Sequence, residues 1–327
     1  MAVYTEISDM ELAAYLRLYD IGELHSIKGI AEGVENSNFL ITTDDGPFIL
    51  TLYEKRVASE DLPFFLGLKE HLADAGFSCP RPIAMKSGET LGTLAGRPSA
   101  IISFLDGLSV SEPTVKNCYQ VGAALGKMHL LASDFKIHRK NALTLENWRP
   151  LFEASGERAN EVQEGLVKFI STELDFLEKN WPGTLPSGVI HADLFPDNVF
   201  FLKDQLSGFI DFYFACNDLL AFDLATCINA WCFDAKNVFE PEKANALIRG
   251  YVSERPLSQA EYDALPILCR GSALRFLLTR LYDWLNVPPG ALVVPKKPDE
   301  YIEKLRFHQT INQTPSYELS AKEAGLL

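Results

Sequence analysis

This chain is poor in basic residues, long apolar runs and paired cysteines. It has 30 Lys and Arg against 44 Asp and Glu, a formal net charge of −14. Duplex binding needs clustered basic side chains that displace counterions, so we expect no nucleic-acid partner. No stretch approaches the roughly 20 consecutive apolar residues of a membrane span, and the first residues lack the positive patch and apolar run of a secretory signal. We therefore expect no membrane association.

The six cysteines are scattered, none forms a CxxC pair, and most have apolar neighbours. This pattern predicts buried thiols in the reducing cytoplasm and argues against a disulfide or metal framework. The chain nevertheless has what a large core requires, because 47% of its 327 residues are hydrophobic. That length exceeds one typical compact domain and favours either two lobes or one large domain with an appendage.

The N-terminal third has the pattern of a small antiparallel sheet with helices. A capping box at Ser8–Glu11 predicts a helix over 8–20, and an apolar stretch closed by Gly76 predicts another over about 62–75. The turn Asp44-Asp45-Gly46-Pro47 between two β-rich runs predicts a hairpin. The expected strands are 24–30, 38–43, 48–53, 91–94 and 99–104.

From about residue 110 the periodicity becomes helical, with apolar stripes over 121–129, 162–177 and 273–281. Short strand-like runs remain at 188–190, 199–202 and 208–210. A sheet followed by helices predicts an α+β protein of two lobes. We place the boundary at a Gly-containing junction, which gives a sheet lobe of residues 1–105 and a mainly helical lobe of residues 106–327.

The densest polar signal is His191-Ala-Asp193-Leu-Phe-Pro-Asp-Asn198, followed by a turn and Gly-Phe-Ile-Asp211-Phe. If 199–202 pairs with 208–210, Asn198 and Asp211 emerge at the same end of the hairpin. Two such oxygen donors suit Mg²⁺, which prefers few protein ligands together with substrate phosphates. Asp193 is then left to accept a proton from a hydroxyl group. Protein kinases divide these roles in the same way in H-R-D-x-x-x-x-N and D-F-G.

The segments 191–201 and 208–212 resemble the aminoglycoside phosphotransferase and choline kinase superfamily, whose signature is H-x-D-x-x-x-x-N followed by I-D-F/W. Gly122 to His129, in a G-x-x-L-G-x-x-H pattern, and Asp223-Leu-Ala also fit it. The resemblance implies a two-lobed protein-kinase-like fold, ATP and Mg²⁺ as cofactors, and a small alcohol as acceptor. Asp193 would be the catalytic residue.

Several further segments resemble those of the bacterial homoserine kinases of this superfamily: Gly33–Phe39, Phe48–Glu54, Leu62–Phe65 and Ala273–Trp284 are among them. The implied substrate is an amino-acid alcohol, L-homoserine, phosphorylated on its hydroxyl for threonine biosynthesis. A small molecule is accordingly the expected partner. The sequence does not determine the oligomeric state.

On the nucleotide side, the loop between two predicted strands would cover the phosphates through Gly33, Asn36, Ser37 and Asn38. The next strand carries Thr51 where related kinases have a Lys, and the Glu partner of that Lys is also missing. How the phosphates are neutralised therefore stays open. Backbone groups of Ser103, Phe104 and Leu105 at the lobe junction are candidates for binding adenine.

On the acceptor side, a carboxylate calls for Arg, His or a helix N-terminus. Arg270, Arg275 and Arg280 lie five residues apart on a predicted helix. Five residues turn a helix by about 500°, so the three do not all face one pocket, and at most one or two bind the carboxylate. Arg275 and Arg280 are the candidates. Tyr213 and His191 are further candidates, and His191 has either a structural or an acid–base role. Asp223 is expected to be a buried hydrogen-bond acceptor that steadies the catalytic loop.

Three other functions remain open at this point. The first is a kinase for another alcohol, such as choline, an aminoglycoside or a sugar. The second is a nucleotide-binding regulator without turnover, which the missing Lys–Glu pair favours. The third is a metal-dependent hydrolase built on His191, Asp193 and Asp211.

Overall fold

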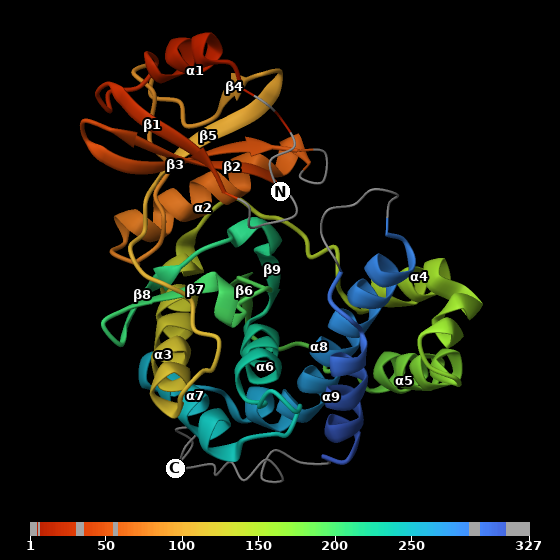
Figure 1. Cartoon of the computed structure of the whole chain (residues 1–327). Coiled ribbons are helices and arrows are strands. Elements are labelled where there is room, and N and C mark those ends of the chain that lie inside the picture. Colours follow the sequence, from red (N-terminus) through yellow and green to blue (C-terminus); the bar gives the residue numbers. More distant parts are fainter. Residues whose placement is uncertain (1–4, 6, 31–35, 55–57, 288–294, 312–327) are drawn as a thin grey trace.

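The computed structural model describes residues 5, 7–30, 36–54, 58–287 and 295–311. Its N-terminal part is a five-stranded antiparallel sheet of order β1-β2-β3-β5-β4, drawn at the top of Figure 1. The strands are β1 (Leu24–Gly29), β2 (Asn36–Thr43), β3 (Gly46–Tyr53), β4 (Gly92–Leu94) and β5 (Arg97–Ser103). The predicted hairpin is confirmed, with β2 paired to β3 from Asn36↔Tyr53 to Thr43↔Gly46.

One helix lies on each side of this sheet (Figure 1). Helix α1 (Asp9–Leu16) has the predicted capping box at Ser8 but ends four residues earlier than expected. Its buried Leu12 and Tyr15 share a hydrophobic cluster with the sheet. Helix α2 (Leu62–Asp74) instead belongs to the large cluster that continues into the helical part. The second helix therefore joins the two parts of the molecule.

The chain leaves the sheet after β5 and crosses to the helical part through Gly107. The backbone φ of Gly107 is +134°, and a Cβ there would lie 2.9 Å from the carbonyl oxygen of Phe201. Glycine meets both constraints because it has no side chain. Next to it, Leu108 forms an antiparallel bridge with Phe201, which ties the connection to the strand predicted over 199–202.

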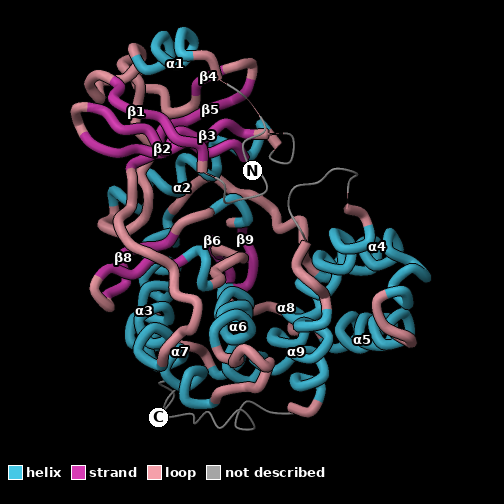
Figure 2. The backbone as a smooth tube through the Cα atoms, in the orientation of Figure 1, coloured by secondary structure: helices cyan, strands magenta, loops and turns pink. Residues whose placement is uncertain are grey.

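The rest of the chain is mainly helical, with short strands enclosed by helices (Figure 2). Helices α3 and α7 pack so closely that a Cβ on Gly122 would lie 1.9 Å from the Leu247 carbonyl oxygen. The helices are α3 (Val115–Leu131), α4 (Leu145–Ser155), α5 (Leu166–Asn180), α6 (Leu220–Trp231), α7 (Pro241–Glu254), α8 (Gln259–Leu285) and α9 (Asp299–Gln309). Single 3₁₀ segments cover Ser59–Asp61, Ala132–Asp134, Gly156–Glu161, Pro196–Asn198 and Phe212–Phe214.

Four short strands form two ribbons in this part. The predicted hairpin β7 (Val199–Leu202) and β8 (Gln205–Phe209) is present, and β6 (Ser187–Ile190) precedes the catalytic loop. The partner of β6 is β9 (Cys216–Leu219), a strand that the sequence did not predict. The residues of β9, Cys-Asn-Asp-Leu, have little strand propensity. The strand therefore forms because it pairs with β6 and not because of a local preference.

All six cysteines are buried and free of disulfides, as predicted. Within the described part of the chain, no helix combines the length and the apolar character needed to cross a membrane.

Candidate active site

The catalytic loop runs from the end of β6 to the start of β7, and Asp211 follows the partner strand β8. The backbone N–H of Ile210 donates to the carbonyl oxygen of Asn198 at 3.0 Å, which continues the β7–β8 ladder by one pair. Asn198 and Asp211 therefore emerge at the same end of the hairpin, as the sequence predicted.

Asn198 is oriented by the loop that it ends. Its side-chain Nδ2 donates to the backbone oxygen of Asp193 at 2.8 Å and to Asp193 Oδ2 at 3.3 Å. Among the described residues, no donor is bound to the remaining amide oxygen. Together with the exposed carboxylate of Asp211, that oxygen fits a hard cation that keeps most of its ligands from substrate and water. The described residues contain no cluster of three or more His, Cys, Asp or Glu, so a closed protein cage for the metal is not seen there.

Asp223 on α6 fixes the start of the loop. Its two carboxylate oxygens accept the backbone N–H groups of His191 at 2.7 Å and Ala192 at 2.9 Å. His129 Nε2 lies 3.1 Å from the same carboxylate. Burial alone would raise the pKa of Asp223, but the hydrogen bonds from the His129 ring and from the His191 N–H outweigh it and lower that pKa. The expected steadying role of Asp223 agrees with these contacts.

The loop also holds a strained residue. Ala192 has φ +65°, a conformation that a non-glycine residue adopts only when its surroundings enforce it. Its N–H is held by Asp223, and its carbonyl oxygen accepts Nη1 of Arg275 at 2.7 Å. The sequence makes Arg275 a candidate substrate ligand, and in the structure one of its N–H groups binds the backbone of the catalytic loop. Two residues on, the indole N–H of Trp231 donates to the carbonyl oxygen of Leu194 at 2.7 Å.

His191 is fully buried behind the loop. Its Nε2 lies 3.0 Å from the carbonyl oxygen of Ile210, and its ring packs against Phe212 with centroids 4.8 Å apart. Burial lowers the pKa of His191, which keeps the ring neutral at ordinary pH. These contacts link the catalytic loop to the segment carrying Asp211. They favour the structural role over acid–base chemistry.

Asp193 is partly buried and faces positive charge from several elements. Burial raises the pKa of its carboxyl, while the charges of Arg275, Lys296 and Arg280 act in the opposite direction. Arg275 and Arg280 come from α8, and Lys296 precedes α9. A carboxylate in this position can accept a proton from a hydroxyl group.

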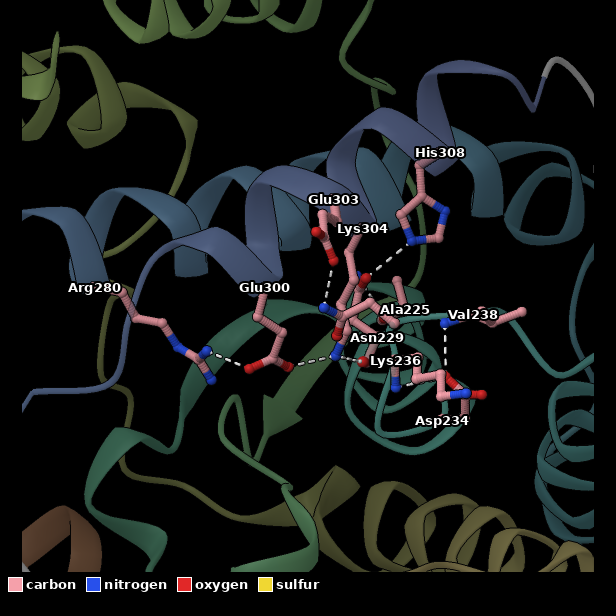
Figure 3. A network of polar contacts seen from close by, with 11 residues as sticks. Ala225, Asn229, Asp234, Lys236, Val238, Arg280, Glu300, Glu303, Lys304 and His308 are labelled. Carbon is pink, nitrogen blue, oxygen red and sulfur yellow. Dashed lines mark hydrogen bonds and ion pairs between the residues drawn. The ribbon is translucent and has the colours of Figure 1, made fainter. Parts of the chain in front are cut away.

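Arg280 is bound by a helix that the sequence did not predict. Glu300, in the first turn of α9, accepts Arg280 Nη1 at 2.5 Å and Lys304 Nζ at 2.6 Å (Figure 3). Lys304 also donates to the carbonyl oxygen of Asn229, and His308 Nε2 lies 2.9 Å from the Asn229 side chain. The sequence of α9 mixes charges of both signs and has no long apolar run, so its pattern indicates a helix only weakly. Asp and Glu in its first turn nevertheless suit the start of a helix.

The predicted nucleotide-covering residues lie partly in the sheet. Asn36, Ser37 and Asn38 are the first residues of β2, which begins two residues earlier than expected, so their assignment to a loop was wrong. Ser37 donates to Glu54 Oε1 at 2.8 Å, and the Thr51 hydroxyl donates to Asn38 Oδ1 at 2.8 Å. These side chains therefore have partners within the sheet or on Glu54, which directly follows β3. Gly33 lies outside the described residues.

At the lobe junction, Ser103 ends β5 and exchanges two 2.8 Å hydrogen bonds with Arg81: its N–H donates to the Arg81 carbonyl oxygen, and its hydroxyl accepts the Arg81 N–H. Phe104 is exposed and Leu105 is half-buried. Tyr213 packs edge-on against Tyr53 of β3 and Phe65 of α2. These contacts place Tyr213 between the sheet part and the helical part.

Comparisons with known proteins identify the family of this chain. The model of the family described as "Phosphotransferase enzyme family" matches residues 26–257. The homoserine kinase of Brucella anthropi is 60% identical over 325 residues, 99% of this chain and 100% of that protein. The homoserine kinase of Rhodopseudomonas palustris is 63% identical over 312 residues, 95% of each chain.

Solved structures with low sequence identity share the fold. Choline kinase from Cryptosporidium parvum superposes with a TM-score of 0.67 at 15% identity, covering 98% of each chain. Amicoumacin kinase hAmiN, in complex with AMP-PNP, Ca²⁺ and Ami, gives 0.66 at 17% identity over 93% of each chain. The predicted two-lobed, protein-kinase-like fold is thus confirmed. The chain belongs to the phosphotransferase enzyme family, in the group that contains the homoserine kinases.

Proposed function

We propose that this protein is a cytoplasmic kinase that transfers the γ-phosphoryl group of ATP to the hydroxyl of L-homoserine, yielding O-phospho-L-homoserine for threonine biosynthesis. The observation that carries the choice of acceptor is the positive charge around Asp193. Arg275, Arg280 and Lys296 all act on its carboxylate. Such surroundings suit an alcohol that bears a carboxylate and disfavour a cationic alcohol such as choline or an aminoglycoside. The names of the relatives support the same acceptor.

The residues of the loop divide the reaction between them. The acceptor oxygen forms a bond to the γ-phosphorus, the bond from that phosphorus to the bridging oxygen breaks, and ADP leaves. Asp193 orients the acceptor hydroxyl and takes its proton. Asn198 and Asp211 are the residues that would hold Mg²⁺, which neutralises phosphate charge when bound. Positioning and charge stabilisation then supply most of the catalysis.

We assign the nucleotide to the space between the lobes, which meet near residue 105. Backbone groups of 103–105 are proposed to bind adenine, and the segment around Gly33 to cover the phosphates. Since Asn36, Ser37, Asn38 and Thr51 are engaged within the sheet or with Glu54, we expect backbone groups rather than these side chains to contact the nucleotide. Phosphate charge is left chiefly to the metal.

The test is ADP release from Mg-ATP by the purified protein with L-homoserine, choline, glucose or no acceptor. We expect release that depends on L-homoserine and stays near background in the other three reactions. Equal release without any acceptor would point to a hydrolase. Nucleotide binding without release under any condition would support the regulator, and preference for choline or glucose would move the protein to another acceptor class.

A further inference from the structure

Arg280 is held on α9 by contacts of two kinds. Glu300 pairs with its Nη1 at 2.5 Å, and its guanidinium carbon lies 4.5 Å above the ring centroid of Tyr301. Glu300 is in turn bound by Lys304, which is itself anchored to the backbone of α6 (Figure 3). Among the described residues, Arg280 has no other hydrogen-bond partner. Its Nε and Nη2 groups are therefore left to bind something else.

Tyr301 lies under this arginine and has an unusual hydroxyl. The side chain is fully buried, and its ring packs against Phe276 with centroids 5.2 Å apart. The hydroxyl has no hydrogen-bond partner among the described residues. A buried polar group without a partner is unfavourable, and native proteins nearly always satisfy such groups with protein, water or ligand.

Four charged side chains act electrostatically on Tyr301. Besides Arg280 and Glu300, both Asp193 of the catalytic loop and Arg275 of α8 act electrostatically on Tyr301. The Tyr301 side chain is thus within electrostatic reach of the proposed catalytic base and of both arginines. Burial raises the pKa of Tyr301 well above its usual value, so the group stays a hydrogen-bond donor at neutral pH.

Resting on the homoserine kinase activity proposed above, we propose that Tyr301 and Arg280 form the subsite for the carboxylate of the amino-acid alcohol. The Tyr301 hydroxyl donates a hydrogen bond to that carboxylate, and the free side of the Arg280 guanidinium supplies the opposite charge. Glu300 is a positioning residue that holds Arg280 against the Tyr301 ring. Tyr301 is accordingly a specificity-determining residue: an acceptor without a carboxylate gains nothing from it.

The test compares L-homoserine with 3-aminopropan-1-ol, the same amino alcohol without its carboxylate. Tyr301→Phe removes only the hydroxyl and keeps the ring under Arg280. Loss of a hydrogen bond to a charged group should raise the KM for L-homoserine about tenfold to a hundredfold. The KM for ATP and kcat/KM for 3-aminopropan-1-ol should stay within about twofold. Tyr282→Phe, at an exposed tyrosine of α8, is the matched control and should change none of them.

A second readout does not depend on turnover. Since the Tyr301 hydroxyl has no hydrogen-bond partner in the described part of the chain, Tyr301→Phe should have a Tm equal to or above that of the wild type without ligand. The rise in Tm that saturating L-homoserine produces in the wild type should be much smaller in the variant. Arg280→Gln should weaken L-homoserine binding more than Tyr301→Phe does. Arg280→Lys, which keeps the positive charge, should bind L-homoserine more tightly than Arg280→Gln.

Two results would overturn the subsite. One is an unchanged KM for L-homoserine in Tyr301→Phe, and the other is an equal loss with both acceptors, which would indicate a general packing role. Failure of the proposed function gives a different signature. In that case the wild type itself would release no ADP in response to L-homoserine.

Discussion

The catalytic loop and the β2–β3 hairpin are held in place in different ways. In the loop, backbone groups of Ala192 and Leu194 are bound by buried side chains of two helices. Helix α6 contributes Asp223 and Trp231, and α8 contributes Arg275. In the hairpin, polar side chains bond mainly within the sheet, as Thr51 does to Asn38. The loop proposed to carry the chemistry therefore depends on long-range contacts of the helical lobe, whereas the sheet proposed to cover the nucleotide depends on local pairing.

This difference offers a reason why the missing Lys–Glu pair is tolerated. A buried Lys without its Glu, or the reverse, would leave an uncompensated charge, whereas Thr51 and Asn38 satisfy each other as neutral groups. The sheet keeps its structure without the pair. The groups assigned to proton transfer and metal binding all lie in the helical lobe.

The largest effect is expected at the loop itself. Asp193→Asn keeps the shape of the side chain but removes its basicity. We expect kcat with L-homoserine to fall about a hundredfold to ten-thousandfold, because general-base catalysis contributes factors of that size. Binding of an ATP analogue, measured by calorimetry, should be retained. Turnover equal to the wild type would remove Asp193 from the mechanism.

The wild-type pH profile tests the same residue. Burial raises the pKa of Asp193, so the base should be protonated, and activity lost, at a higher pH than for an ordinary Asp. Plotting kcat/KM against pH should show an acidic limb that is absent from the residual activity of Asp193→Asn. An identical limb in both proteins would assign it to another group.

The next largest effect should come from Asp223→Asn. An amide cannot accept both loop N–H groups through two oxygens, so one buried donor loses its partner. We expect a loss of about 3 kcal/mol in the free energy of unfolding, measured with urea, together with lower kcat. Asp204→Asn, at an exposed turn between β7 and β8, is the matched control and should have little effect.

A smaller, pH-dependent effect is expected at His308. Burial and the charges of Lys304 and Arg270 lower its pKa to about 3. Below about pH 6.5 the unfolded chain binds a proton there that the folded chain does not, so stability falls as pH falls, by up to about 1.4 kcal/mol per pH unit for this group. His308→Gln should show a shallower fall between pH 6.5 and 5 in urea unfolding. Parallel curves would contradict this origin.

The smallest effect is predicted in the sheet. Thr51→Val removes one neutral hydrogen bond to Asn38 and should lower the free energy of unfolding by about 1 kcal/mol. Since that hydroxyl is engaged within the sheet, the KM for ATP should stay within about twofold. A large rise in the KM for ATP would show that Thr51 contacts the nucleotide and would weaken the contrast between the two regions.

Local patterns in the sequence predicted much of this molecule. The capping box at Ser8, the turn at 44–47 and the spacing of Asp193, Asn198 and Asp211 act over a few residues, and the structure reproduces each arrangement. Other features depend on distant partners. Strand β9 exists through pairing with β6, and α9 contributes Glu300 and Tyr301 from some twenty residues beyond Arg280.

The candidate site shows the same division. Asp193 and its neighbours form one short motif, so spacing alone was enough to predict roles for them. No spacing indicates that Arg275 binds the backbone of Ala192, or that Arg280 stacks on Tyr301, since those contacts depend on how α8 packs against the loop and α9. The acceptor side was therefore the least predictable part.

The most direct test of the central claim is phosphorus NMR of a reaction containing the protein, Mg-ATP and L-homoserine. The account predicts a phosphomonoester signal that grows in step with ADP and is absent when L-homoserine is omitted. ADP accompanied by inorganic phosphate alone, with no phosphomonoester, would contradict transfer to the homoserine hydroxyl.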